Sequence, residues 1–208
     1  IETGQMETQQ FELTNEPRRY QKSDARIREI LAEAKRIVSQ EGYDSLTFSN
    51  LAKRLGIRRF NVQYYFPSID TLLRELIANA AAEQSIRDLE FADSMSAEEK
   101  VDMYFDHIVA NLSNELERGF YLQLHALSAS NAQIAAYVDE LYEQFSDDLV
   151  TTLKLINPDL SLAERRRKAK IIICLVDGMG MVLDQKLSQR KYKSVRDEAV
   201  DTILKIIF

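Results

Sequence analysis

The sequence contains few of the residues that interrupt regular structure. Among its 208 residues there are 6 glycines and 3 prolines, and tryptophan is absent. An all-β fold needs many more turn-forming residues, so this scarcity favours long helical segments separated by few breaks. With 45% hydrophobic residues the chain can also bury a sizeable core. We therefore predict an all-α fold of about nine helices, with an N-terminal three-helix head and a larger helical body.

Cysteine is equally scarce. The single cysteine, Cys174, excludes an internal disulfide and lies in the apolar run IIICLV. We interpret it as a small core residue of a protein in a reducing compartment, and we expect the protein to be cytoplasmic. No apolar run approaches the roughly 18 residues of a membrane span, so no membrane partner is expected.

The motifs of common enzyme classes are also missing. There is no phosphate-binding glycine loop, no nucleophile elbow and no cysteine–histidine pair at a meaningful spacing. Gly178-Met179-Gly180 lies inside an apolar helical pattern without a preceding strand, so it is not a dinucleotide fingerprint. His107 and His125 are the only histidines, and they lack neighbouring cysteines that would make a metal site. We expect no enzyme activity, no catalytic residue, no metal and no cofactor.

Charge is present but unevenly distributed. The net charge is −6, yet residues 17–66 contain eleven lysines and arginines against five acids. The remainder contains 16 basic and 28 acidic residues. A basic head on an acidic body is the asymmetry expected when only one end of a protein meets phosphate.

The segment 47–66, TFSNLAKRLGIRRFNVQYYF, has the size of a helix-turn-helix. Thr47 is a good N-cap, Ala52 allows a close helix crossing, Gly56 can end the first helix, and Val62 points back into the module. The side chains left to face outward suit phosphates and base edges, and the alternative is an ordinary exposed helix of an interaction domain. The predicted DNA-contacting residues are Thr47, Arg58, Arg59, Asn61, Gln63 and Tyr64.

Helical patterns divide the rest of the chain. We predict a flexible arm over 1–20, a helix-turn-helix domain over 21–67, a connecting helix within 68–90 and a regulatory and dimerisation body over 91–208. Ser96 with Glu99, and Ser161 with Glu164, form two predicted capping boxes. Gly119 is expected to interrupt the helical pattern between them.

The segment GYDSLTFSNLAKRLGIRRFNVQYYFPSIDTLL resembles the DNA-binding domain of TetR-type transcriptional regulators (the TetR/AcrR family). The resemblance covers roughly residues 24–77 and rests on Leu51-Ala52, Leu55-Gly56-Ile57 and Tyr65-Phe66-Pro67-Ser68. Two positions depart from it. The family usually has tyrosine in place of Gln63 and lysine in place of Ile69, and both typically contact phosphate.

This resemblance implies a bacterial regulator that binds double-stranded DNA as a homodimer. It also implies a dimer interface on the last two helices, where the IIICLV run with its two glycines would form the seam. Predicted interface residues are Ile173, Val176, Gly180, Leu183, Ala199 and Ile203. The alternative for this run is an intramolecular core helix.

The family resemblance also implies a pocket for a small apolar or amphipathic effector in the body, although an aromatic stripe at helical spacing is equally typical of plain core. The candidate pocket residues are Phe105, Ile108, Tyr121, His125, Tyr142 and Phe145. We expect a repressor that such an effector releases from a palindromic operator. Gln63 and Ile69 favour one alternative, an all-helical dimeric interaction protein with a degenerate helix-turn-helix that no longer binds DNA.

Overall fold

A computed structural model describes residues 21–86, 89–92, 94–112, 114–182 and 189–208. Over these residues it contains α-helices, one 3₁₀ turn at Tyr43–Ser45, and no strand, which confirms the all-α prediction. The predicted arm over 1–20 lies outside the described residues. The helices are α1 Gln21–Glu41, α2 Phe48–Leu55, α3 Arg59–Tyr65, α4 Ile69–Gln84, α5 Ala97–Leu112, α6 Glu115–Ser128, α7 Ala132–Ile156, α8 Leu162–Val182 and α9 Gln189–Ile207.

Local sequence signals set most of the helix ends. The Thr47 side chain accepts a hydrogen bond from the backbone N–H of Asn50 at 3.1 Å, so it caps α2 as predicted. Gly56 has φ 65°, and the following Ile57 N–H donates to the Ala52 carbonyl at 3.0 Å, which closes the end of α2. Both predicted capping boxes form; for example, the Ser96 N–H donates to the Glu99 carboxylate at 2.7 Å.

The predicted connecting helix ends earlier than expected. Instead of reaching about Glu90, α4 stops at Gln84, where Ser85 is extended with ψ 134°. Ile86, just beyond the end of α4, is buried in the core of the body. Its burial requires the chain to leave the helical path, and helical periodicity alone does not contain that information.

Gly119 does not interrupt the helix, which corrects a second expectation. It lies inside α6, and a Cβ atom on it would stand 2.3 Å from Ser39 Oγ and 3.1 Å from the Ser39 carbonyl of α1. The absence of a side chain therefore lets α6 approach α1 closely.

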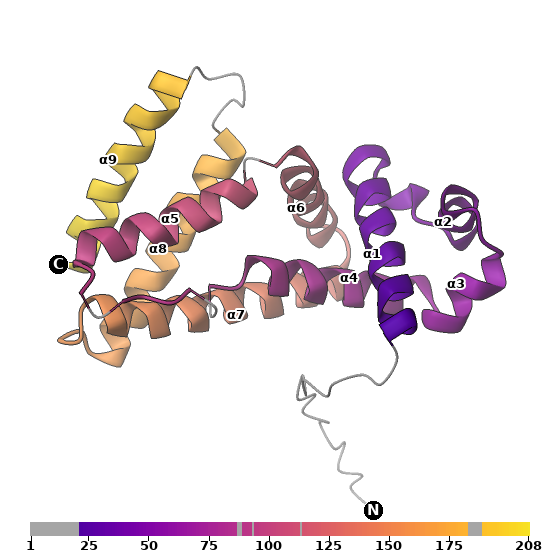
Figure 1. Ribbon diagram of the computed structural model, residues 1–208, viewed down its shortest axis with the longest axis horizontal. Coiled ribbons are helices and arrows are strands. Elements are labelled where there is room, and N and C mark those ends of the chain that lie inside the picture. The colour runs from indigo at the N-terminus through magenta and orange to yellow at the C-terminus, as the bar shows by residue number, and fades with distance from the viewer. Residues whose placement is uncertain (1–20, 87–88, 93, 113, 183–188) are drawn as a thin grey trace, which may run out of the picture.

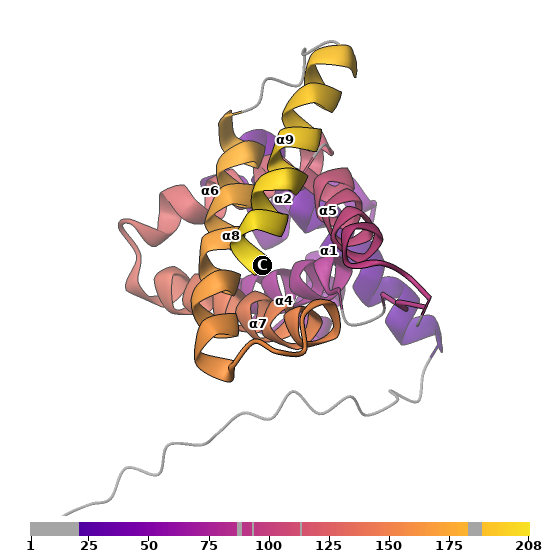
Figure 2. The ribbon, with the colours of Figure 1, turned by 90° about the vertical axis from the view of Figure 1, so that its left-hand side faces the viewer.

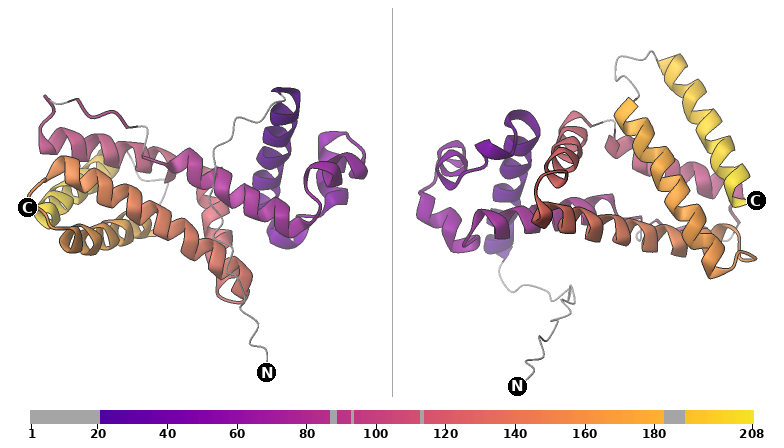
Figure 3. Two further views of the ribbon diagram at one scale, coloured as in Figure 1. Left: turned by 90° about the horizontal axis from the view of Figure 1, so that it is seen from below. Right: turned by 180° about the vertical axis from the view of Figure 1, so that it is seen from behind.

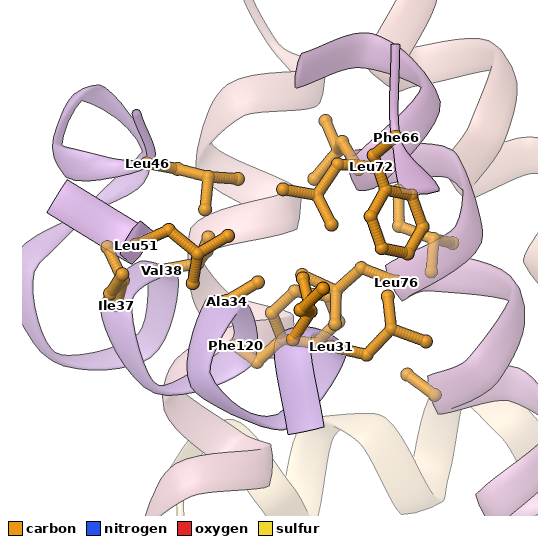
Figure 4. Packing of buried hydrophobic residues seen from close by; sticks show 14 of the residues in the cluster. Leu31, Ala34, Ile37, Val38, Leu46, Leu51, Phe66, Leu72, Leu76 and Phe120 are labelled. Atoms are coloured by element: carbon orange, nitrogen blue, oxygen red, sulfur yellow. The ribbon is translucent and has the colours of Figure 1, made fainter. Parts of the chain in front are cut away.

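Two hydrophobic cores organise the molecule, and they do not divide at residue 90. The first contains the apolar residues of α1 to α4 together with Phe120 and Leu124 of α6 and three residues from the first half of α7. Figure 4 shows Phe120 beside Leu31 and Ala34 of α1. The second core joins α5, the second half of α7, α8 and α9. Two helices of the body, α6 and the first half of α7, thus pack their apolar side chains into the core of the head.

The helices place the head and the last two helices at opposite ends of the molecule (Figure 1). Helices α4 and α7 pack against each other and connect the two ends, as the view from below shows (Figure 3). At the end far from the head, α8 and α9 lie side by side (Figure 2). Over the described residues, the helices are too short or too polar to span a bilayer.

Candidate nucleic-acid interface and ligand cavity

Helix α3 presents a polar face to solvent and an apolar face to the head. Val62 is fully buried and Phe66 nearly so, which fixes the orientation of the seven-residue helix. On the other face Arg58, Arg59 and Asn61 are exposed. Thr47 and Tyr64 are exposed as well, and Gln63 is half-buried. The structure therefore brings the six predicted residues to one end of the molecule, and their contact with DNA stays a prediction.

The arginines of the head fall into two groups. Arg54 is held by Glu33 at 3.1 Å and by Glu41, and Arg36 is held by Glu33. Arg58 and Arg59 form no ion pair with any residue that the structure describes. The charge of α3 is therefore available to an external anion, whereas the charge of Arg54 and Arg36 is compensated inside the head.

Two residues near this surface, Phe60 and Lys53, were not among the predicted contacts. Phe60 is 73% exposed and Tyr64 is 74% exposed, and they lie one helical turn apart on α3. Lys53, in the last turn of α2, is exposed and also without an ion pair to a described residue. The signal for Phe60 was in the sequence, since a large aromatic residue stands directly beside two arginines.

Ile69 has a structural reason to be apolar. It begins α4 and packs, half-buried, against the core of the head. At this position the chain contributes to packing and offers no charge to a phosphate.

A buried lysine joins the head to the body. Lys35 of α1 donates to Glu83 of α4 at 2.5 Å and to Glu117 of α6 at 2.8 and 3.0 Å. Its Nζ atom also lies 5.9 Å from the centre of the Phe120 ring. The Lys35 side chain is 6% exposed and that of Glu117 15%. This cluster, together with the Gly119 contact, connects α1 to α6.

Helix α4 is also fixed to the body by hydrogen bonds. The Tyr137 hydroxyl of α7 donates to the Asp70 carboxylate at 3.1 Å, in the first turn of α4. The Tyr121 hydroxyl of α6 donates to the Ala80 carbonyl at 3.4 Å. A movement of α6 or α7 would therefore displace α4, which packs in the same core as α3.

Two hollows meet in the body. The first lies among α6, α7 and α8 and the second among α5, α7 and α8; their empty space, about 410 and 460 Å³, includes solvent at their open sides. Both are lined by Phe145 and Asp177. Of the predicted pocket residues, the first hollow contains Tyr121, His125, Tyr142 and Phe145, and the second contains Ile108 and Phe145.

Phe105 lines neither of these two hollows, so its place in a ligand pocket stays a prediction. Its side chain is fully buried in the second core, and the Arg196 guanidinium lies 5.8 Å from its ring centre. The helical stripe correctly placed Phe105 on the inner face of α5. The packing of α9 against α5 covers Phe105, and the helical pattern alone could not show this.

Asp177 is the one acid in the apolar half of α8, and the prediction of pocket residues omitted it. It accepts a hydrogen bond from the Tyr142 hydroxyl, and burial raises its pKa above the ordinary aspartate value. Burial and the nearby Asp177 charge also raise the pKa of Tyr142. His125 Nε2 lies 2.9 Å from the Tyr142 oxygen.

The predicted dimer interface needs correction. The side chains of Val176, Ala199 and Ile203 pack inside the subunit, in the second core, so they are not available to a partner. Ile173 and Gly180 line the hollows, and Leu183 lies outside the described residues. The burial of these residues follows from the pairing of α8 with α9 and α7 within one chain.

A different face of α8 is exposed and apolar. Its members recur at helical spacing, and a Cβ atom on Gly178 would meet nothing within 4 Å. Cys174 belongs to this face and is exposed, so its interpretation as a core residue is wrong. The α8 face, as we name it, consists of Ile171, Cys174, Gly178, Met181 and Val182.

Comparison with known proteins agrees with this architecture. Residues 30–76 match the family described as bacterial regulatory proteins, tetR family. No curated protein sequence shows significant similarity to the chain.

Solved structures resemble the chain over most of its length. A TetR transcriptional regulator from Legionella pneumophila superimposes with a TM-score of 0.64 at 23% identity, over 84% of this chain and 95% of the other. A TetR transcription regulator from Haloarcula marismortui gives a TM-score of 0.68 at 17% identity, over 88% and 97%.

A protein from Saccharomonospora viridis, described as a transcriptional regulator and solved in complex with choline, gives a TM-score of 0.63 at 20% identity, over 86% and 96%. The chain therefore combines the DNA-binding domain of the tetR family of bacterial regulatory proteins with the all-helical fold of TetR-family transcriptional regulators.

Proposed function

We propose that this protein is a homodimeric repressor that binds a palindromic operator through α3 and leaves it when a small molecule enters the body. One observation supports the DNA contact above all. Arg58, Arg59 and Asn61 are exposed on the face of α3 opposite the buried Val62, and neither arginine is neutralised by a described residue. Two adjacent uncompensated cations on one exposed face favour contact with an external anion such as phosphate.

In this proposal α3 lies in the major groove of the DNA. Arg58 and Arg59 contact phosphates, while Asn61 and Gln63 reach base edges with their amide groups. Phe60 extends the surface with an apolar side chain that can contact a thymine methyl group. One short helix reads few bases, so two heads are expected to bind successive grooves about 34 Å apart.

The α8 face supports a dimer in which the two heads are paired. An exposed apolar stripe with a glycine at its centre allows a second helix to approach closely. We expect the double substitution Ile171→Glu and Val182→Glu to convert the protein to a monomer at micromolar concentration, raising the dimer dissociation constant roughly 100-fold or more, because like charges would meet across the twofold axis.

Analytical ultracentrifugation measures this change directly. The matched control is Leu155→Glu on α7, because Leu155 is 52% exposed and Ile171 is 54% exposed. The control should remain dimeric. If the double variant also remained dimeric, the interface would lie on another face.

The contacts between head and body provide the route for release. A ligand in the first hollow touches Tyr121 and His125 of α6, and α6 shares the first core and the Lys35 cluster with α1. A shift of α6 would therefore change the position of the head relative to the body, and the two heads of a dimer would no longer match the groove spacing. The choline complex of the S. viridis protein supports a small-molecule site in this fold.

A salt titration with duplex DNA tests the proposal against the interaction-protein alternative. We expect binding to random duplex at about 0.05 M salt, followed by a steep loss of affinity as salt rises, because each phosphate contact releases counterions. Fluorescence anisotropy of a labelled duplex measures it. Absence of binding at low salt would support the alternative, in which the helix-turn-helix no longer binds DNA.

A further inference from the structure

Asp177 occupies the point where the two hollows of the body meet. The second hollow is lined by aliphatic and aromatic side chains and by two acids, Asp177 and Asp148, without a lysine, arginine or histidine. The first hollow contains one arginine, Arg118. Among the residues that the structure describes, neither Arg118 nor any other cation forms an ion pair with Asp177.

A carboxylate in such surroundings has no ion-pair partner among the described residues, although His125 in the first hollow favours its charged form. Removing it from water is costly unless it is paired, and the hydrogen bond from Tyr142 supplies only part of the compensation. The raised pKa of Asp177 has this cause, since burial outweighs both the Tyr142 hydrogen bond and the neighbouring His125. A bound cation would provide the missing partner.

The side chains around Asp177 select the kind of cation. Tyr104 and Phe145 line the second hollow, and Tyr121, Tyr142 and Phe145 line the first. The rings of Tyr142 and Phe145 meet edge to face, with their centres 6.0 Å apart. Aromatic faces attract ammonium groups through their quadrupole and accommodate alkyl substituents.

A bare metal ion fits these surroundings poorly. Hard cations need six or more oxygen ligands, and the described residues contain no group of three side chains arranged to hold a metal. The lining presents mainly ring faces, and its side-chain carboxylate and hydroxyl oxygens come from two aspartates and three tyrosines. The site therefore suits a cation that carries its own apolar substituents.

We propose that the two hollows, at the point where they share Asp177 and Phe145, bind a small organic cation, an alkylammonium or quaternary ammonium compound. Its charge lies at the Asp177 carboxylate and its alkyl groups lie against Phe145 and the flanking rings of Tyr104 and Tyr142. The proposal narrows the expected effector from apolar or amphipathic to cationic. Its regulatory meaning rests on the proposed function, but binding itself does not require DNA.

A cation bound at Asp177 would also affect the position of α6. The Asp177 carboxyl group is hydrogen-bonded to the Tyr142 hydroxyl, whose oxygen lies 2.9 Å from Nε2 of His125 on α6. A cation that draws Asp177 toward itself weakens the Tyr142 hydrogen bond and changes the support of His125. The ligand site and the head-contacting helix are thus joined by two hydrogen bonds.

Isothermal titration calorimetry of the full protein without DNA tests the proposal. Three probes of similar size share a compact methylated centre and carry different charges: tetramethylammonium is a cation, tert-butanol is neutral and pivalate is an anion. Benzyltrimethylammonium adds a ring to the cation. We expect saturable binding of both ammonium ions, at least roughly 10-fold weaker binding of tert-butanol and none of pivalate.

Asp177→Asn should weaken ammonium binding roughly 30-fold or more, because the charge is lost while an oxygen acceptor for Tyr142 is kept. Asp139→Asn, an exposed position on α7, is the matched control and should bind like the parent protein. Equal binding of tert-butanol and tetramethylammonium, preference for pivalate, absence of ammonium binding, or unchanged binding by Asp177→Asn would each overturn the proposal.

The comparison of the three probes needs no variant, so it remains decisive even if Asp177→Asn failed to fold. Because the titration contains no DNA, its outcome is separate from that of the salt titration. A protein that binds DNA but no ammonium ion would retain the proposed function and lose only the ligand class.

Discussion

Replacement of both Arg58 and Arg59 by alanine is expected to lower affinity for duplex DNA at least about 100-fold at 0.15 M salt or below. The two guanidinium groups are exposed and unpaired with any described residue, so their charge is free to displace counterions from phosphate. A dimer would lose four such contacts. The slope of log affinity against log salt concentration should then fall by about 0.9 for each phosphate, or by about 3.6 in all.

Anisotropy titrations over a range of salt concentrations measure both quantities. Arg166 and Arg167 of α8 provide a matched control, because they are adjacent, exposed and remove the same net charge when both become alanine. The control should change the slope little. An equal loss in both double variants would show that overall charge governs binding. Unchanged affinity in the α3 variant would show that the DNA-facing surface lies elsewhere.

Lys35→Met is expected to lower the free energy of unfolding by roughly 3 kcal/mol. The lysine is almost fully buried between Glu83 and Glu117, and Glu117 is itself only 15% exposed. Removal of the ammonium group leaves the Glu117 carboxylate desolvated without its partner. Glu83 is half-exposed and can turn toward water, so it adds less to the loss. The melting temperature should fall by about 6–12 °C for a chain of this size.

Urea denaturation at fixed protein concentration measures the change, because a dimer's stability depends on concentration. The double variant Lys35→Met and Glu117→Gln should recover most of the lost stability, since it removes the stranded charge as well. Lys53→Met, at an exposed lysine of α2, should shift stability by less than about 0.5 kcal/mol. A loss below about 1 kcal/mol for Lys35→Met would mean that the cluster is solvated and does not hold α1 to α6.

The cluster of Lys35, Glu83 and Glu117 also holds the head against the body. Its three charged members come from α1, α4 and α6, so weakening it loosens the head against the body as well as the core. None of these partners is close in sequence to another. Helical patterns predict that each residue is on a helix, and they contain no information on which charges meet.

Local chemistry determined the elements of this protein. Thr47, Gly56 and the two capping boxes act through hydrogen bonds to residues within four or five positions, so the sequence was sufficient to place those helix ends. The orientation of α3 followed for the same reason, since the burial of Val62 leaves its neighbours exposed.

Tertiary structure decided the features that depend on partners far along the chain. Gly119 lies within α6, where its lack of a side chain lets the helix approach Ser39, and α4 ends at Gln84, just before Ile86 joins the core of the body. The apolar run of α8 showed that the helix is buried somewhere, but it has apolar residues on more than one face. Only the packing of α7 and α9 against it buried Val176 and left Ile171 and Cys174 exposed.

Asp177 shows the same division most clearly. In the sequence it is one acid in an apolar run, and nothing in its neighbours shows whether it faces water. The fold surrounds it with aromatic side chains from α6 and α7 and leaves it without an ion pair to any described residue. Periodicity and capping are properties of neighbouring residues and can be read from the chain. The environment of a charge is set by the elements that pack around it, and it exists only in the folded molecule.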